Sequence, residues 1–209
     1  MRKIIICIFL VLTFICSCSE KSKTASNSLD KEKALGSGKQ YTDPKKAIEY
    51  LNNAIKLKPN NAETYAKRGD VYFNLGQYQQ AIEDFNKAIG LKQDYPNAYN
   101  DRGAAYIGLG QYQRAIEDFN KAIGLKQDYT SAYNNRGAAY IKLGQYRQAI
   151  EDFNKAIGLK QDYTSAYSNR GAAYLLQGNK KLGCPDWQKA CALGDCKRLE
   201  LAKGKGFCR

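Results

Sequence analysis

The 14-residue stretch IEDFNKAIGLKQDY occurs three times in the chain, at Ile82–Tyr95, Ile116–Tyr129 and Ile150–Tyr163. Each copy begins 34 residues after the one before it. Its apolar residues recur at helical spacing, and a fixed period of this length is typical of arrays in which each repeat is one supersecondary unit. The stretch therefore predicts a series of stacked helical repeats.

The similarity extends outward from this stretch over units of 34 residues that begin at Ala62, Pro96, Thr130 and Thr164. In every unit position 4 is tyrosine, position 8 is glycine, position 11 is tyrosine and position 27 is alanine. Positions 20 and 24 are alanine and phenylalanine in the first three units, and glycine and tryptophan in the fourth. This pattern resembles the tetratricopeptide repeat family, in which each unit is a pair of antiparallel helices, A and B.

The resemblance implies an all-α fold, a right-handed superhelical solenoid of stacked antiparallel helix hairpins. Small residues at positions 8 and 20 would let helices A and B approach closely, while the aromatic residues fill the space around that contact. The tyrosine and phenylalanine stripe is therefore expected in the core and not around a cofactor. The glycines at position 15 are expected to end helix A; they are Gly76, Gly110, Gly144 and Gly178.

The N-terminus has the pattern of an export signal. Arg2 and Lys3 precede an apolar run over residues 4–16 that is interrupted only by Thr13. This run is too short to span a bilayer as a helix, since a span needs about 20 residues. The sequence ICSC at residues 15–18 resembles the lipobox of bacterial lipoproteins. The resemblance implies cleavage before Cys18 and lipidation of its thiol. The alternative is ordinary secretion that leaves Cys18 as a free thiol.

These features predict a protein of the bacterial cell envelope, lipid-anchored on the periplasmic side of a membrane, with the outer membrane preferred. The lipid anchor is the only membrane contact that we expect. The expected segments are a lipoprotein signal peptide (1–17), a lipid-anchored flexible tether (18–40), the B helix of a degenerate first repeat (41–61), three regular repeats (62–95, 96–129 and 130–163), a variant repeat (164–195), and a C-terminal capping helix with a cysteine-containing tail (196–209).

The basic charge of the chain is concentrated near its ends. The formal net charge is +13, yet residues 62–163 hold 13 Lys and Arg against 12 Asp and Glu, whereas residues 164–209 hold 9 against 3. A protein that neutralises phosphates along a groove needs its cations on that groove, so this placement argues against nucleic-acid binding. The basic end supports one alternative function, that of a structural envelope lipoprotein whose C-terminal end contacts anionic glycan or lipid.

The stacked A helices are expected to form a concave wall, which in the tetratricopeptide repeat family commonly binds an extended peptide or a partner helix. The resemblance therefore implies a protein–protein interaction scaffold or adaptor. An amide-rich wall can hydrogen-bond a peptide backbone, although ordinary solvated helix faces are the alternative reading. The expected partner-binding residues are Lys67, Asp70, Asn74, Asn97, Asn100, Asp101, Asn134, Asn135, Lys142 and Asn169, with Ser131, Ser165 and Ser168 between them.

The sequence lacks the residues that catalysis needs. It contains no histidine, no nucleophile beside a base, no phosphate-binding loop and no metal-ligand spacing outside the terminal cysteines. We therefore expect no enzyme activity, no cofactor and no metal site.

Arginine recurs at position 7, where the family usually has leucine, as Arg68, Arg102, Arg136 and Arg170. Aspartate recurs at position 23, as Asp84, Asp118 and Asp152. Antiparallel packing of helices A and B brings these two positions to a similar height. The pattern therefore predicts Arg–Asp pairs that join the two helices of each hairpin.

Four cysteines lie at the C-terminal end, and in an oxidising exported compartment we expect them to form two disulfides. Cys184 and Cys191 would lie about 10 Å apart on one helix, which disfavours that pair. Of the two pairings left, we prefer Cys191–Cys196 with Cys184–Cys208, because Gly194 can turn the chain back over the end of the helix. A four-thiolate zinc site and buried free thiols are the alternatives.

Overall fold

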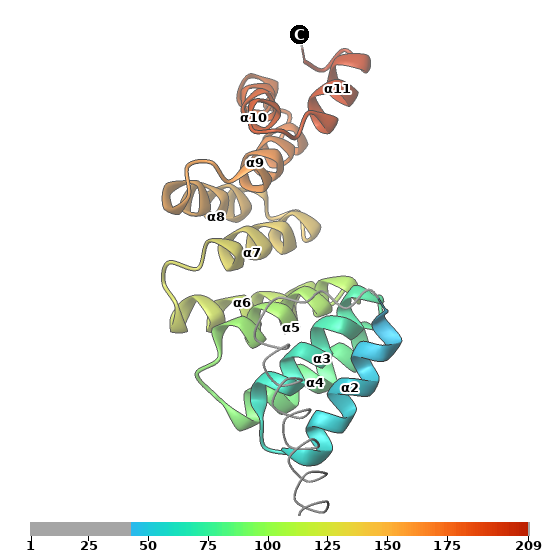
Figure 1. Cartoon of the computed structure of the whole chain (residues 1–209). Coiled ribbons are helices and arrows are strands. Elements are labelled where there is room, and N and C mark those ends of the chain that lie inside the picture. The colour runs from blue at the N-terminus through green and yellow to red at the C-terminus, as the bar shows by residue number, and fades with distance from the viewer. Residues whose placement is uncertain (1–42, 209) are drawn as a thin grey trace, which may run out of the picture. The chain divides into compact units, whose positions relative to one another are not determined.

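The computed structural model describes residues 43–208 (Figure 1). Cys18 and the predicted signal peptide and tether lie outside the described residues. No helix within residues 43–208 has both the length and the apolar character that a membrane crossing requires. The helices of this part are, in chain order, α2 (Pro44–Leu57), α3 (Ala62–Asn74), α4 (Tyr78–Leu91), α5 (Pro96–Gly108), α6 (Tyr112–Leu125), α7 (Thr130–Lys142), α8 (Tyr146–Leu159), α9 (Thr164–Leu176), α10 (Lys180–Ala192) and α11 (Lys197–Gly204).

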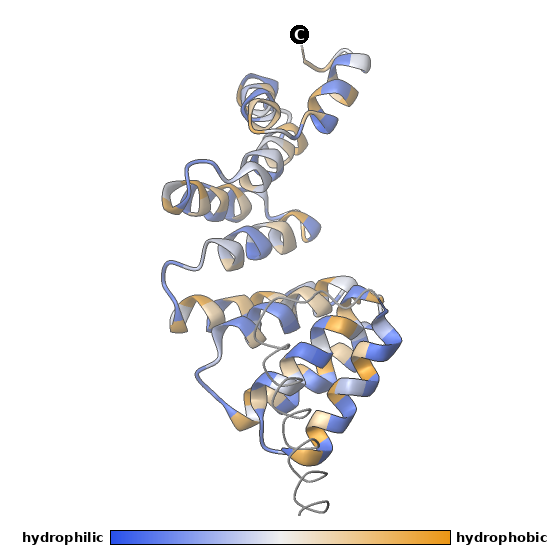
Figure 2. Ribbon diagram, in the orientation of Figure 1, coloured by the Kyte–Doolittle hydropathy of each residue, from blue (hydrophilic) through white to orange (hydrophobic). Residues whose placement is uncertain are grey.

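The helices pack as hairpins that stack in sequence order. The closest pairs are α3 with α4, α5 with α6, α7 with α8 and α9 with α10, and each B helix also packs on the A helix that follows it. The A helices α3, α5, α7 and α9 touch one another from repeat to repeat. Figure 2 shows both apolar and polar residues on α2, α3 and α4, as expected for helices that each bury one face. The predicted all-α array of stacked helix pairs is confirmed.

Glycine at position 8 lets a phenylalanine ring lie against the A helix. A Cβ atom added to Gly103 would lie 2.7 Å from the ring of Phe119, and one added to Gly69 would lie 2.8 Å from the ring of Phe85. Phe85, Phe119 and Phe153 are fully buried. The phenylalanines of the aromatic stripe are therefore core, as the sequence predicted, whereas among the tyrosines at positions 4 and 11 only Tyr106 is buried and the others are half-buried.

In the variant fourth repeat the backbones of the two helices lie close together. Gly183 takes the place of alanine at position 20, and a Cβ atom there would lie 2.9 Å from the carbonyl oxygen of Gly171. Trp187 replaces phenylalanine, and its indole Nε1 donates a hydrogen bond of 2.9 Å to the carbonyl oxygen of Ser168. The larger ring thus gains a polar partner on the A helix.

Each A helix ends at a glycine with a left-handed backbone. Gly76 has a φ of 72°, and its equivalents Gly110, Gly144 and Gly178 have φ values of 73°, 72° and 81°. The amide N–H after the glycine returns to the helix, since Gln77 donates to the carbonyl of Tyr72 at 2.9 Å. This closes the last turn of the A helix and reverses the chain into the B helix.

The C-terminal end is covalently closed. Cys184 pairs with Cys208, and Cys191 pairs with Cys196, which is the pairing preferred from the sequence. These four sulfurs are disulfide-bonded, and within residues 43–208 no group of metal-ligating side chains lies together. The capping helix α11 buries Leu199 and Ala202, as expected.

Candidate partner-binding face

One arginine in each A helix fixes the position of that helix. Nε and Nη2 of Arg68 donate to the two carboxylate oxygens of Asp84 at 2.7 and 2.6 Å. Its third contact reaches back to the preceding repeat, because Nη1 donates to Oδ1 of Asn52 on α2 at 2.7 Å. The predicted Arg–Asp pairs are confirmed, and each arginine also bonds the preceding B helix. The equivalent sets are Arg102–Asp118–Asn86, Arg136–Asp152–Asn120 and Arg170–Asp186–Asn154.

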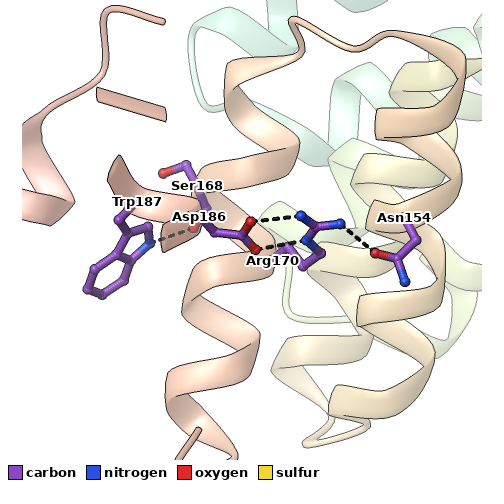
Figure 3. A network of polar contacts seen from close by, with 5 residues as sticks. All are labelled: Asn154, Ser168, Arg170, Asp186 and Trp187. Atoms are coloured by element: carbon purple, nitrogen blue, oxygen red, sulfur yellow. Dashed lines mark hydrogen bonds and ion pairs between the residues drawn. The ribbon is translucent and has the colours of Figure 1, made fainter. Parts of the chain in front are cut away.

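Figure 3 shows the last of these sets, with the guanidinium of Arg170 held between Asp186 and Asn154. Hydrogen bonds to Asp186 raise the pKa of Arg170, so the guanidinium stays protonated. The aspartate is almost fully buried, at 6% exposure. Removal of the cation would leave a buried carboxylate without a counter-charge, which is costly.

The arginines leave one side of the A helices facing away from the B helices. We call this side the inner wall; it consists of positions 2, 5, 6, 9, 12 and 13 of α3, α5, α7 and α9. The ten predicted contact residues occupy these positions, but their exposure differs. Asn100 and Asn134 are buried at 6% and 7% exposure, so they do not face a partner freely. Exposed residues are Asp70, Asn74, Asn97 and Lys142; half-buried residues are Lys67, Asp101, Asn135 and Asn169.

The wall amides bond to one another across repeats. Nδ2 of Asn135 donates to Oδ1 of Asn100 at 3.1 Å, and Asn100 donates to Oδ1 of Asp101 at 3.0 Å. One repeat later, Nδ2 of Asn169 donates to Oδ1 of Asn134 at 3.1 Å. Asn134 in turn donates to Asn135 at 3.5 Å. We call these five residues the amide chain.

The two ends of the amide chain determine its direction. At one end Arg198 of α11, which can only donate, gives hydrogen bonds to Oδ1 of Asn169 at 3.4 Å and to the carbonyl oxygen of Ser168 at 3.3 Å. At the other end the carboxylate of Asp101 can only accept. Both bonds between repeats, from Asn135 and from Asn169, are therefore donated toward the N-terminal side of the array.

Negative charge gathers where α3 and α5 adjoin. The neighbouring helices remove part of the water around Asp70 and Asp101, and this desolvation raises the pKa of both carboxyl groups. The pKa of Asp70 reaches about 7, with repulsion from Asp101 as the second cause and Lys67 acting against it. Desolvation, with these two carboxylates, also raises the pKa of Tyr129 to about 12. The four groups are therefore electrostatic neighbours.

Sequence comparison identifies the architecture. A family model described as TPR repeat matches residues 45–76, 69–110 and 105–144, and a model described as tetratricopeptide repeat matches residues 130–163. The chain belongs to the tetratricopeptide repeat family. Its members are non-catalytic scaffolds, so this tetratricopeptide repeat array is a scaffold for protein or peptide binding and not an enzyme. No curated protein is significantly similar to the chain.

Solved tetratricopeptide repeat structures resemble the array closely. A crystal structure of MamA is 30% identical, with a TM-score of 0.67 over 83% of this chain and 96% of that one. A second MamA structure is 31% identical, with a TM-score of 0.65 over 84% of this chain and 90% of that one. The first TPR domain of Spaghetti (RPAP3), bound to an HSP90 peptide, is 27% identical, with a TM-score of 0.55 over 56% of this chain and 94% of that one.

One cavity of the array does not coincide with the predicted contact residues. It has a volume of about 670 Å³ and lies at the loop between α2 and α3, where Lys58, Glu63, Lys92 and Tyr95 line it. Position 34 is tyrosine in the three regular tetratricopeptide repeats, but here it is Asn61, whose side chain instead caps α3 by accepting from the N–H of Thr64 at 3.1 Å. The cavity therefore belongs to the degenerate start of the array.

The sequence did not indicate several residues that bond to the A helices. Arg198 was not a candidate, because nothing in the motif places the capping helix against α9. Asp186 could have been found, since it follows Asp152 by the repeat period of 34 residues. The asparagines that bond the arginines, such as Asn120, recur with the same period, and that recurrence was the available signal.

Proposed function

We propose that this chain is a lipid-anchored scaffold of the bacterial cell envelope that binds a segment of a partner protein, a peptide or a helix, along the inner wall. The envelope location is supported by the basic N-terminus, the short apolar run and the lipobox-like sequence at residues 15–18. The binding role is supported by the family and by the Spaghetti domain, which is bound to the peptide SRMEEVD.

We choose the inner wall as the binding face from a comparison of two neighbouring repeats. The repeats at 96–129 and 130–163 differ at only six of 34 positions. The two differences on the B helix exchange glutamine and arginine without a change of composition, so the chemical difference lies on the A helix. The paired residues are Pro96 and Thr130, Asn97 and Ser131, Asp101 and Asn135, Gly108 and Lys142, Gln113 and Arg147, and Arg114 and Gln148.

Three of the four A-helix differences fall at inner-wall positions 2, 6 and 13. The core, the arginine sets and the turns are the same in both repeats, so packing does not require the changes at positions 2 and 6. At position 13 packing favours glycine in the first of the two repeats, because a Cβ atom on Gly108 would lie 2.7 Å from the ring of Tyr78. A surface that varies on an otherwise constant scaffold is the surface that carries specificity. This is why we assign partner recognition to the inner wall and not to the outer B-helix face.

Photo-crosslinking in living cells tests the proposal. A photoreactive amino acid at exposed Asn97 of the inner wall should crosslink to a discrete partner. The same amino acid at exposed Lys121, on the outer face of α6, is the matched control. Equal crosslinking from both positions, or crosslinking from Lys121 alone, would show that the inner wall is not the binding face.

The alternative role, contact of the basic C-terminal end with anionic glycan or lipid, has only a charge count to support it. Arg198, one of the cations of that end, is bonded to Ser168 and Asn169 within the fold. Binding of anionic vesicles that is lost when Lys180, Lys181 and Lys197 are all replaced by glutamine would favour that role.

A further inference from the structure

Charge along the inner wall changes sign from the N-terminal repeats to the C-terminal repeats. Asp70 of α3 and Asp101 of α5 carry the negative end, whereas Lys142 of α7 and Arg198 of α11 carry the positive end. The positive end also holds one carboxylate, that of Asp195, which accepts a hydrogen bond from Ser168 at 3.3 Å, so its two cations exceed its anions by one. The wall positions of α9 hold only serine, asparagine and apolar residues. The inner wall therefore has a charge gradient, from negative at its N-terminal end to positive at its C-terminal end.

Neither carboxylate at the negative end forms an ion pair with a residue of 43–208. Asp101 accepts a hydrogen bond at Oδ1 from Asn100, a neutral donor, and Oδ2 has no donor in that part of the chain. Lys67, whose charge lowers the pKa of Asp70, forms its ion pair with Glu63 at 2.7 Å and not with Asp70. The negative end thus retains its capacity for a cation.

The cations at the positive end can likewise bind an anion. Lys142 is exposed and forms no ion pair with any residue of 43–208. Arg198 is exposed and bonds only neutral oxygens, those of Ser168 and Asn169. Neither cation is paired with a carboxylate, so each can attract an anionic group of a partner.

The repeat comparison shows that this gradient is not a by-product of folding. Asn135 occupies in α7 the place of Asp101 in α5, and it accepts from Asn134 as Asp101 accepts from Asn100. A neutral amide is therefore compatible with the fold at this position. The carboxylate at Asp101 adds charge to the wall without a structural need for it.

We propose that the inner wall binds a dipolar polypeptide segment in one orientation, with its basic residues over α3 and α5 and its acidic residues over α7 to α11. This inference rests on the proposed function, since it names the chemistry and the direction of the partner that the same wall takes. Complementary charge contributes mainly specificity and correct orientation, because wrong orientations are penalised by repulsion. The exposed amide of Asn97 remains available for the backbone of the segment.

Selection from a random dodecapeptide library on the mature chain tests the chemistry. Enriched peptides should carry lysine or arginine toward one end and aspartate or glutamate toward the other. The Asp101→Asn variant, which copies the residue found in the next repeat, should weaken binding of the enriched peptides by about three- to five-fold, as expected for one solvated ion pair.

A charge exchange tests the orientation. A selected peptide with a photoreactive group at its basic end should crosslink to α3 or α5 in the wild type. In the Asp101→Asn/Asn135→Asp double variant, which keeps composition and net charge, the crosslink should move to α7.

The outcomes separate this inference from the proposed function. Peptides that bind the inner wall without a charge bias, or whose crosslink does not move in the double variant, would overturn the orientation while leaving the scaffold role intact. If no enriched peptide contacts the inner wall, the scaffold role on this face is overturned as well.

Discussion

Arg68 and Asp84 lie sixteen residues apart on the two helices of one hairpin and join through two parallel hydrogen bonds of 2.7 and 2.6 Å. The pair is more than a link within the hairpin, because the same guanidinium bonds Asn52 of the preceding helix. Bidentate geometry is the strong form of an ion pair. The equivalent arrangement in every repeat therefore fastens three helices together at one point.

Replacement of Arg136 by alanine should lower the free energy of unfolding by about 3 kcal/mol, because it leaves the buried carboxylate of Asp152 without its partner. The Asn120→Ala variant removes only the bond to the preceding repeat and should cost about 1 kcal/mol. Urea denaturation of both variants measures the difference. Equal losses would mean that the ion pair contributes nothing beyond a neutral hydrogen bond.

Two glycine-to-alanine changes should have opposite effects on stability. Gly103→Ala places a methyl group 2.7 Å from the ring of Phe119, and such overpacking costs about 1–3 kcal/mol. Gly124→Ala on α6 meets nothing within 4 Å, so it should stabilise the helix by up to about 1 kcal/mol through higher helix propensity. Thermal unfolding distinguishes them, and stabilisation by both variants would show that close approach of the helices is not required.

The two disulfides should differ in their contribution. Cys184–Cys208 spans 24 residues and Cys191–Cys196 spans 5, so loop-closure entropy gives about 3.5 kcal/mol for the first and about 2 kcal/mol for the second. Replacing each pair by serine and measuring unfolding tests this order. Thiol counting on the exported protein should find no free thiol among these four cysteines until a reductant is added.

The ionisation of Asp70 should make stability depend on pH. Its pKa is about 7 in the folded chain against an ordinary value of 3.8, so the folded state binds the proton more tightly and loses stability as pH rises between these values. Asp70→Asn should therefore stabilise the protein at pH 8, by less than about 1 kcal/mol because solvent screens the carboxylate, and not at pH 3. The same gain at both pH values would contradict this origin.

Cys18 should carry lipid in cells. Metabolic labelling with a fatty-acid analogue is expected to mark the wild-type chain and not the Cys18→Ser variant, because acyl chains are attached through this thiol. The variant should also leave the membrane fraction, since the anchor is the only membrane contact expected. Equal labelling of both chains would contradict the lipobox reading.

Features that repeat every 34 residues could be predicted from the sequence. The contact of Gly103 with Phe119 and the pairing of Arg68 with Asp84 each follow from residues that recur at fixed positions of a known hairpin. Hydrogen bonds between repeats could not be predicted in the same way. The bond from Asn135 to Asn100 depends on the angle and spacing between neighbouring hairpins, which side-chain spacing along one helix does not contain.

The motif also could not predict which inner-wall residues are exposed and which are buried. Asn100 and Asn97 lie three residues apart on one helix, yet the first is buried and the second is exposed. The difference arises because the next A helix covers position 5 and not position 2. Only the stacked structure therefore separates residues that build the wall from residues that a partner can reach.

The Arg–Asn bonds between successive repeats also affect which changes in repeat number the protein can tolerate. Each regular unit offers an asparagine to the unit after it and an arginine to the unit before it, so an in-frame duplication or deletion of 34 residues leaves every donor and acceptor matched. The terminal unit is different, because its B helix carries Gln188 in place of that asparagine and is closed by disulfides. Duplication of a repeat inside the array thus keeps all Arg–Asn bonds, whereas a repeat added after the crosslinked last unit would lack its asparagine.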